Sequence, residues 1–204
     1  GENKKDAIIN FKGGLNVIAG ASDTGKSFAF ECIDFALGSS SNPKTVPEMK
    51  GYRSVFLEIE DIGQEEIFTL RRNFSEDEKN EIFIYYSNYQ EKDAAEVEKL
   101  SVTHNAKKSL SKKLLNCCDC TYKYVMKNTK GDTQAFTFRS FSPLIMINEL
   151  RITARHSPIY HTDSRGSTFA TPARTAFKTV ISGIDYKKEE KKENTEIIKA
   201  KLKG

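Results

Sequence analysis

The residues best suited to chemistry form a short loop that combines glycines, one lysine and hydroxyl side chains. The loop matches the pattern G-x-x-x-x-G-K-[ST] at every specified position. Glycines let successive backbone N–H groups turn toward phosphate oxygens, the lysine can reach the β- and γ-phosphates, and the following hydroxyl can hold Mg²⁺. The pattern predicts a nucleotide-phosphate site made of Gly20, Ala21, Ser22, Asp23, Thr24, Gly25, Lys26 and Ser27, with Phe28 directly after it.

The residues on either side of the loop also fit a phosphate site. Residues 16–19 are apolar enough for a buried strand, and residues 28–37 are predicted to form an apolar helix that ends at Gly38. A helix N-terminus adds partial positive charge where the phosphates would lie. The alternative is a chance match in a glycine-rich turn, and the strand and helix in register favour the phosphate site.

The elements that must position the loop are predicted from periodicity and turn residues. Before the loop we expect strands over residues 6–11 and 15–19, around a turn at Gly13 and Gly14. After the first helix, an alternation of apolar and polar residues predicts three antiparallel strands over residues 52–59, 66–73 and 81–87. These features predict an α+β fold with a mixed and antiparallel sheet around one nucleotide-binding corner.

The second half of the chain is predicted to contain more helix. Residues 94–100 and 106–118 are helical candidates, residues 123–127 and 134–139 form a hairpin with Gly131 at its turn, and residues 144–147 form a short buried strand. Thr171 can cap a final helix with Pro172 at its first position. The helical spacing predicts a buried face made of Ala173, Ala176, Phe177, Val180, Ile181 and Ile184.

Composition and charge exclude several classes of protein. The chain has 204 residues, enough for one domain, and its 13 Phe and 8 Tyr are too many for a disordered chain. It has no apolar run long enough for a membrane span, and its first residues lead into no signal peptide. Three of its four cysteines lie within four residues, which is a poor disulfide framework, so we expect a cytoplasmic protein. The formal net charge is +4, and residues 187–204 hold seven lysines and four glutamates, so most of the excess lies there.

The residues around the loop and at the far end resemble one family of ATPases. The stretch Gly14-Leu15-Asn16-Val17-Ile18, the helix FECIDFALG over residues 30–38 and the segment ARTAFKTVISGIDY over residues 173–186 resemble the amino-terminal head lobe of SMC, SbcC and RecN proteins, which are ABC-type ATPases. The resemblance assigns residues 1–186 to that lobe and residues 187–204 to the start of a coiled coil. Both ends are therefore expected to be cuts in a longer chain.

The resemblance also implies an activity and partners. It implies binding and hydrolysis of ATP with Mg²⁺, a carboxy-terminal lobe of the same protein that supplies the signature and Walker B motifs, and a head-to-head homodimer that closes on ATP. DNA and a nuclease or effector subunit are implied as further partners, in DNA repair or anti-phage defence. Within the family, the Ser22–Ser27 loop and the pair Asn148-Glu149 look more like the SMC-like ATPases of bacterial defence operons, the Lamassu type.

Glu149 is the second residue to which the resemblance gives a catalytic role, after Lys26. In the family a strand ends in a glutamine that reaches Mg²⁺ and the attacking water, and Glu149 falls at that position. A carboxylate can ligate Mg²⁺ or orient water. Two other interpretations stay open: a degenerate Walker B strand with Asn148 in place of the usual Asp, and a plain buried strand.

Weaker patterns each have a plain structural explanation. Cys117, Cys118 and Cys120 could be zinc ligands, but no second ligand pair accompanies them, so core packing is favoured. His156 and His161 could form a metal or acid–base site, but ordinary polar loop residues are favoured. The arginine-bearing loop over residues 151–174 could contact DNA or the opposing head, or be an ordinary exposed loop. A third set could stack on bases but is favoured as strand packing: Phe83, Tyr85, Tyr86 and Tyr89.

Two other functions compete with the SMC-like ATPase. One is a nucleotide-gated clamp that binds DNA ends or a partner nuclease with little turnover, which predicts strong DNA binding with negligible hydrolysis. The other is a stand-alone small P-loop NTPase, which predicts activity in this chain alone.

Overall fold

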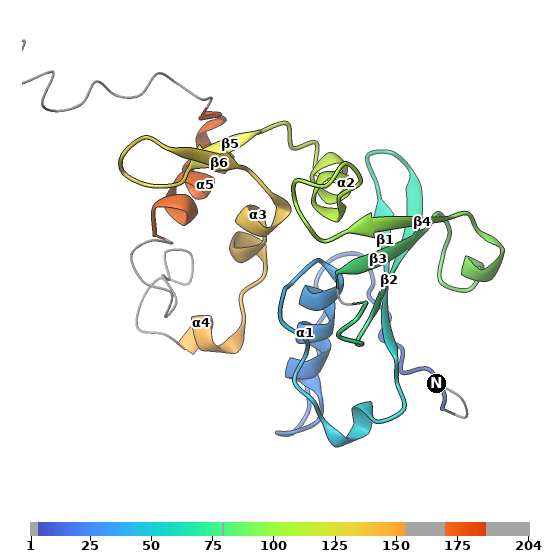
Figure 1. The fold of residues 1–204 in the computed structure, drawn as a ribbon. Helices are drawn as coiled ribbons and strands as arrows, with labels where there is room; N and C mark the ends of the chain where they lie inside the picture. The colour runs from blue at the N-terminus through green and yellow to red at the C-terminus, as the bar shows by residue number, and fades with distance from the viewer. Residues whose placement is uncertain (1–3, 79, 154–169, 187–204) are drawn as a thin grey trace, which may run out of the picture. The chain divides into compact units, whose positions relative to one another are not determined.

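The computed structural model describes residues 4–78, 80–153 and 170–186. The chain divides into two compact units, Gly1–Ser111 and Lys112–Gly204, and each is described by itself (Figure 1). None of the helices in the described residues is long and apolar enough to cross a membrane.

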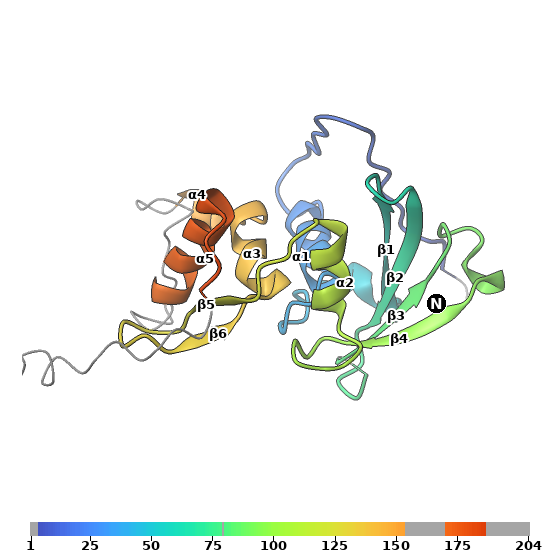
Figure 2. The same ribbon diagram turned by 90° about the horizontal axis from the view of Figure 1, so that it is seen from above.

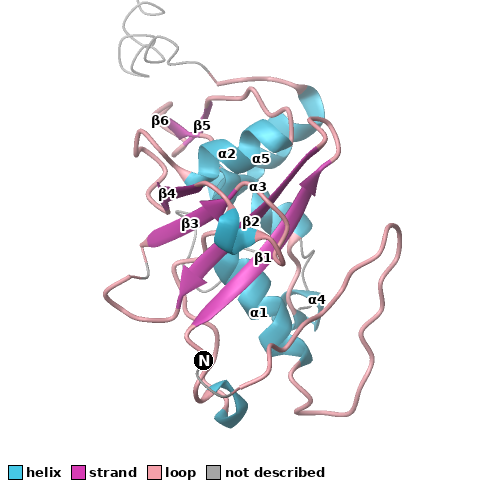
Figure 3. Cartoon of the chain, turned by 90° about the vertical axis from the view of Figure 1, so that its right-hand side faces the viewer, coloured by secondary structure: helices cyan, strands magenta, loops and turns pink. Residues whose placement is uncertain are grey.

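The first unit contains a four-stranded antiparallel sheet. Strands β1 (Ser54–Asp61), β2 (Glu66–Asn73), β3 (Glu81–Tyr85) and β4 (Val97–Ser101) follow one another in the order β1-β2-β3-β4 (Figure 3). Short 3₁₀ segments at Pro47–Met49 and Lys92–Ala94 lie in the connections. Because side chains alternate along a strand, the register places Phe68, Leu70, Ile82 and Ile84 on one fully buried face.

Helix α1 (Lys26–Ala36) covers the buried face of this sheet and contacts β1 and β2. Figure 2 shows the helix on one side of the strands. Phe35 and Ala36, in the last turn of α1, have no exposed surface. Gly38 has φ +94° and its N–H donates to the Phe35 carbonyl at 3.0 Å, which confirms the predicted end of the helix.

A buried arginine fixes the C-terminal end of α1 to the sheet. Arg72 of β2 is 1% exposed, and its guanidinium lies 3.8 Å from the centre of the Phe35 ring. It donates hydrogen bonds to the carbonyl oxygen of Phe35 and, at 2.7 Å, to that of Ser39. Phe35 lies in the last turn of α1 and Ser39 lies just beyond it, so the charged donor binds the chain where the helix ends and orients α1 against the sheet.

The second unit is built around a hairpin and a long helix. Strands β5 (Tyr124–Met126) and β6 (Thr133–Ala135) pair as predicted, with Gly131 at φ +95° in the turn. Helices α3 (Phe138–Ile145), α4 (Glu149–Thr153) and α5 (Ala170–Ser182) complete the unit, and α2 (Leu110–Cys117) contains the boundary between the two units. Asp185, just after α5, accepts hydrogen bonds from the N–H groups of Lys123 and Tyr124 at 3.1 and 2.9 Å.

The two strands predicted before the loop are wrong. Residues 6–11 and 15–19 are not in regular secondary structure. A strand needs a neighbouring strand for its backbone groups, and none pairs with these residues in the described part of the chain. Their large apolar side chains are therefore exposed, at 49% to 92%, as found for Ile8, Ile9, Phe11, Leu15, Val17 and Ile18.

Two predictions between the sheet and α4 are also wrong. A helix was predicted over residues 94–100, but residues 97–101 form β4, because pairing with β3 places Leu100 opposite Ile82 in the core. Residues 144–147, predicted as a strand, form the last turn of α3 and the connection after it. The helix there begins with a capping box, in which Thr137 Oγ1 accepts the N–H of Ser140 at 3.1 Å.

Helix α5 begins before the predicted cap and buries a different face. It starts at Ala170, so Thr171 lies inside it. Thr175, Ala176 and Thr179 are buried, while Ile181 and Ile184 are 68% and 55% exposed. Thr175 Oγ1 donates to the Thr171 carbonyl at 2.9 Å, so the hydroxyl has a hydrogen-bond partner although the residue is buried. The spacing of apolar residues could not predict a buried face that contains threonines.

Replacing Arg72 by Met should destabilise the folded chain by about 2–4 kcal/mol, because two buried carbonyl groups lose a charged donor. Urea unfolding of both variants in the full chain measures the effect. Arg71→Met is the matched control, because Arg71 is half-buried on the other face of β2. Its guanidinium donates to the side chains of Asn73 and Tyr85 rather than to the end of a helix. We expect a loss below about 1 kcal/mol for the control. Equal losses of unfolding free energy in the two variants would contradict the role of Arg72 in fixing α1 to the sheet.

Candidate nucleotide-binding site

The loop over residues 20–27 leads directly into α1. Gly25 occupies the N-cap position in the left-handed region, with φ +83°. No side chain caps the helix, and its first turn holds no acidic residue. The first N–H groups of α1 are therefore not used by side-chain caps, and together with the helix dipole they form an anion-binding site.

The lysine of the pattern lies inside the loop. Lys26 Nζ donates to the Gly20 carbonyl at 2.9 Å, to the Ala21 carbonyl at 2.5 Å and to Thr24 Oγ1 at 3.2 Å. Three oxygens of the loop thus accept hydrogen bonds from its ammonium group. The arrangement concentrates positive charge beside the N-terminus of α1.

Gly20 packs closely against the Thr24 side chain within the loop. A Cβ at this position would lie 2.8 Å from Thr24 Oγ1, which is closer than real contacts allow. The Thr24 hydroxyl is held there because it donates to the Ala21 carbonyl at 2.8 Å. The loop is therefore closed on itself, with glycine where a backbone must approach another group closely.

The residues of the loop fit the phosphates of a nucleotide and a magnesium ion. Backbone N–H groups at a helix N-terminus and a lysine ammonium group suit phosphate oxygens, and the exposed hydroxyl of Ser27 is a hard oxygen ligand of the type that Mg²⁺ prefers. Ala21, Ser22, Asp23 and Thr24 are exposed, and Phe28 is half-buried in the first turn of α1.

Asp23 is the one acidic residue of the loop and has a left-handed backbone, with φ +59°. Its carboxylate forms no hydrogen bond or ion pair with the described residues, although Lys26 lies three positions further along the chain. The loop predicted to bind phosphate thus contains one negative charge that no described residue neutralises.

Glu149 lies in the second unit, at the first position of α4, and is exposed. The preceding Asn148 caps the helix, since its Oδ1 accepts the N–H of Arg151 at 3.0 Å. The plain buried strand that was one interpretation of residues 144–147 is wrong, and the other two interpretations lose the strand on which they relied. The role of Glu149 toward Mg²⁺ stays a prediction.

The thiols do not form a metal site in the described part of the chain, where no group of three or more His, Cys, Asp or Glu could hold a metal ion. Cys118 is exposed, while Cys117 and Cys120 are half-buried, and burial raises the pKa of Cys120. Burial, with a smaller contribution from Glu31, raises the pKa of Cys32 in α1 to about 11, so this thiol stays protonated and unreactive near neutral pH. His156, His161 and most of the arginine-bearing loop lie outside the described residues.

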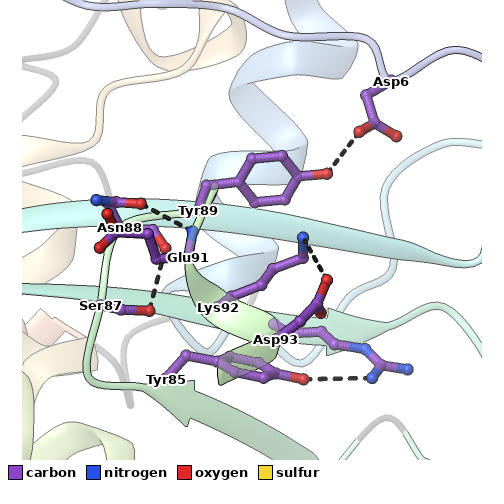
Figure 4. Close-up of polar contacts among 9 residues, drawn as sticks. Asp6, Tyr85, Ser87, Asn88, Tyr89, Glu91, Lys92 and Asp93 are labelled. Carbon is purple, nitrogen blue, oxygen red and sulfur yellow. Dashed lines mark hydrogen bonds and ion pairs between the residues drawn. The ribbon is translucent and has the colours of Figure 1, made fainter. Parts of the chain in front are cut away.

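The aromatic residues of β3 and the following connection form a polar network on the sheet face opposite α1 (Figure 4). Arg71 lies 5.6 Å from the centre of the Phe83 ring and donates to the Tyr85 hydroxyl at 3.4 Å. Lys92 Nζ lies 4.2 Å from the centre of the Tyr89 ring. These rings are half-buried under cations of the same chain, which supports packing over base stacking.

This network also anchors the N-terminal segment, which no local pattern in the sequence indicates. The Tyr89 hydroxyl donates to Asp6 Oδ2 at 2.7 Å, and the Tyr52 hydroxyl donates to the Lys5 carbonyl at 2.9 Å. Burial and then the hydrogen bond to Asp6 raise the pKa of Tyr89 to about 12, so it remains a donor at physiological pH. The segment that leads to the loop is thus attached at residues 5 and 6, and exposed beyond them.

One comparison with known proteins identifies the family of the chain. A family model described as an AAA domain matches residues 4–203. Searches of the curated proteins and of the solved structures found no match. The match covers almost the whole chain, and the fold is that of an α+β P-loop NTPase. The chain therefore belongs to the AAA domain family, whose members are P-loop ATPases that bind nucleotides.

Proposed function

We propose that the chain is the ATP-binding lobe of an SMC-like ATPase head. The observation that carries the proposal is the closed loop over residues 20–27, in which Lys26 Nζ is held by loop oxygens at the uncapped N-terminus of α1. This loop binds the phosphates of ATP through N–H groups and the lysine. A bound Mg²⁺ would neutralise the phosphates and polarise the reacting phosphoryl group.

The exposed apolar segment before the loop supports a carboxy-terminal lobe as partner. Leu15 and Val17 are 92% and 78% exposed, and the segment has no strand neighbour in the described residues. Runs of exposed apolar residues of this size mark interaction surfaces. We propose that strands of a carboxy-terminal lobe of the same protein pair with this segment, bury these side chains and thereby fix the loop.

Hydrolysis requires residues beyond the loop. Ser27 and Glu149 are the proposed Mg²⁺ ligands, and Glu149 is also proposed to orient the attacking water. We propose that a head-to-head homodimer completes the site, because no signature motif or clear Walker B strand occurs in this sequence. ATP then acts by shifting the population toward closed dimers.

We further propose that the protein acts on DNA together with a nuclease or effector subunit, in DNA repair or anti-phage defence. It rests on the resemblance of residues 14–18, 30–38 and 173–186 to SMC-like proteins. ATP turnover measured with and without DNA separates an ATP-driven machine from a clamp with little hydrolysis.

Replacing Lys26 by Ala should weaken ATP binding at least about tenfold and abolish hydrolysis, because the loop loses its only cation. Isothermal titration and an ATPase assay on the full-length protein measure both effects. Lys44→Ala is the control, since Lys44 is a surface lysine that pairs with Glu31. ATP binding and turnover unaffected by Lys26→Ala would overturn the proposed site.

Replacing Gly20 by Ala should weaken ATP binding by about tenfold, since the added Cβ forces the loop and Thr24 apart. Gly13→Ala is the matched control, because a Cβ at Gly13 meets nothing within 4 Å. Comparison of nucleotide affinities for the two variants checks the loop geometry, and equal affinities would contradict it.

The double change of Leu15 and Val17 to Ser should destabilise the protein by at least about 2 kcal/mol when the carboxy-terminal lobe is present. In the 204-residue chain alone the effect should stay below about 0.5 kcal/mol, because both side chains are exposed there. Ile62→Ser is the control, since Ile62 is 84% exposed in the β1–β2 turn. Thermal unfolding of both forms measures the difference, and equal effects in the two forms would count against a covering lobe.

A further inference from the structure

The phosphate loop contains a charge that works against its ligand. Between Gly20 and Ser27 the sequence has one cation, Lys26, and one anion, Asp23. ATP without metal carries close to four negative charges at neutral pH, since its last phosphate loses its second proton at about pH 6. A carboxylate beside such a ligand repels it, so its presence calls for an explanation.

Backbone conformation does not explain why an acid is present. Asp23 has φ +59°, in the left-handed region that glycine, asparagine and aspartate tolerate best. Asparagine would fit this backbone equally well and would carry no charge. The geometry thus selects for a short polar residue or glycine, and the negative charge is a separate property of the site.

The charge is also left to act on the ligand. Lys26 Nζ is directed to the oxygens of Gly20, Ala21 and Thr24, and no described residue forms an ion pair with Asp23. The side chain is exposed, so its field is screened by salt but is not cancelled by a neighbouring cation.

We propose that Asp23 is a specificity-determining residue that lowers nucleotide affinity and selects the Mg²⁺-bound form of ATP over free ATP. This inference rests on the proposed nucleotide site. Mg²⁺ removes two of the negative charges of ATP, so repulsion by Asp23 is smaller for the metal complex. The same argument makes the penalty larger for metal-free ATP than for metal-free ADP, which carries one charge less.

The test is the nucleotide affinity of the full-length protein and of its Asp23→Asn variant, with Mg²⁺ and with EDTA. Asp23→Asn should tighten binding of free ATP by about three- to tenfold. The gain for Mg²⁺-bound ATP should be about two- to threefold, because the complex keeps half of the negative charge and the repulsion energy is halved. The gain should shrink as ionic strength rises. Glu65→Gln is the matched control, because Glu65 is another exposed acid with positive φ, in the β1–β2 turn.

The outcomes separate this inference from the proposed function. Unchanged affinity in Asp23→Asn, or an equal gain with and without Mg²⁺, would overturn the role of Asp23 while the site stands. Weaker binding in Asp23→Asn would also overturn it, since the carboxylate would then be a ligand. Wild-type protein that binds no ATP would overturn the proposed function and this inference together. Unfolding midpoints show that the variants are folded.

Discussion

The attachment of helix α1 to the sheet is the interaction on which the rest of the first unit depends. Arg72, buried in β2, bonds the carbonyl groups at the C-terminal end of α1 and stacks on Phe35. The opposite end of the same helix carries the phosphate loop. A helix fixed at one end by a buried charge presents its other end in a defined direction, so the position of Lys26 follows from a contact far from the chemistry.

The charges of the loop and the exposed apolar residues before it both indicate that the nucleotide site is incomplete in this chain. The helix dipole and Lys26 attract phosphate, whereas Asp23 opposes it, so binding depends on the balance of a few charges. On the other side of the loop, Leu15 and Val17 are exposed, although a segment of this composition is suited to a sheet interior. Both observations fit a lobe that reaches full nucleotide affinity only with a partner, as proposed for the SMC-like head.

Local patterns in the sequence predicted much of the first unit and the loop. The P-loop pattern, the end of α1 at Gly38 and the alternation in β1 to β3 are short-range signals, and the structure confirms α1 and the three strands. The prediction of two strands before the loop was wrong, because strand formation depends on neighbouring strands that no local pattern reveals. Residues 97–101 became β4 through pairing with β3, and the anchoring of Asp6 by Tyr89 joins residues far apart in sequence. Glu149 was placed by resemblance alone, and its helical position shows how little apolar composition distinguishes a short strand from a helix end.

Backbone hydrogen exchange tests the central claim most directly. The amides of residues 20–28 in the full-length protein would be followed with and without Mg²⁺ and ATP, by mass spectrometry. If the loop holds the phosphates, hydrogen exchange at these amides slows on ATP addition. The increase in their protection should exceed the increase seen in the β1–β4 sheet. Saturating ATP that leaves residues 20–28 unprotected, or protects only other segments, would contradict a nucleotide site at this loop.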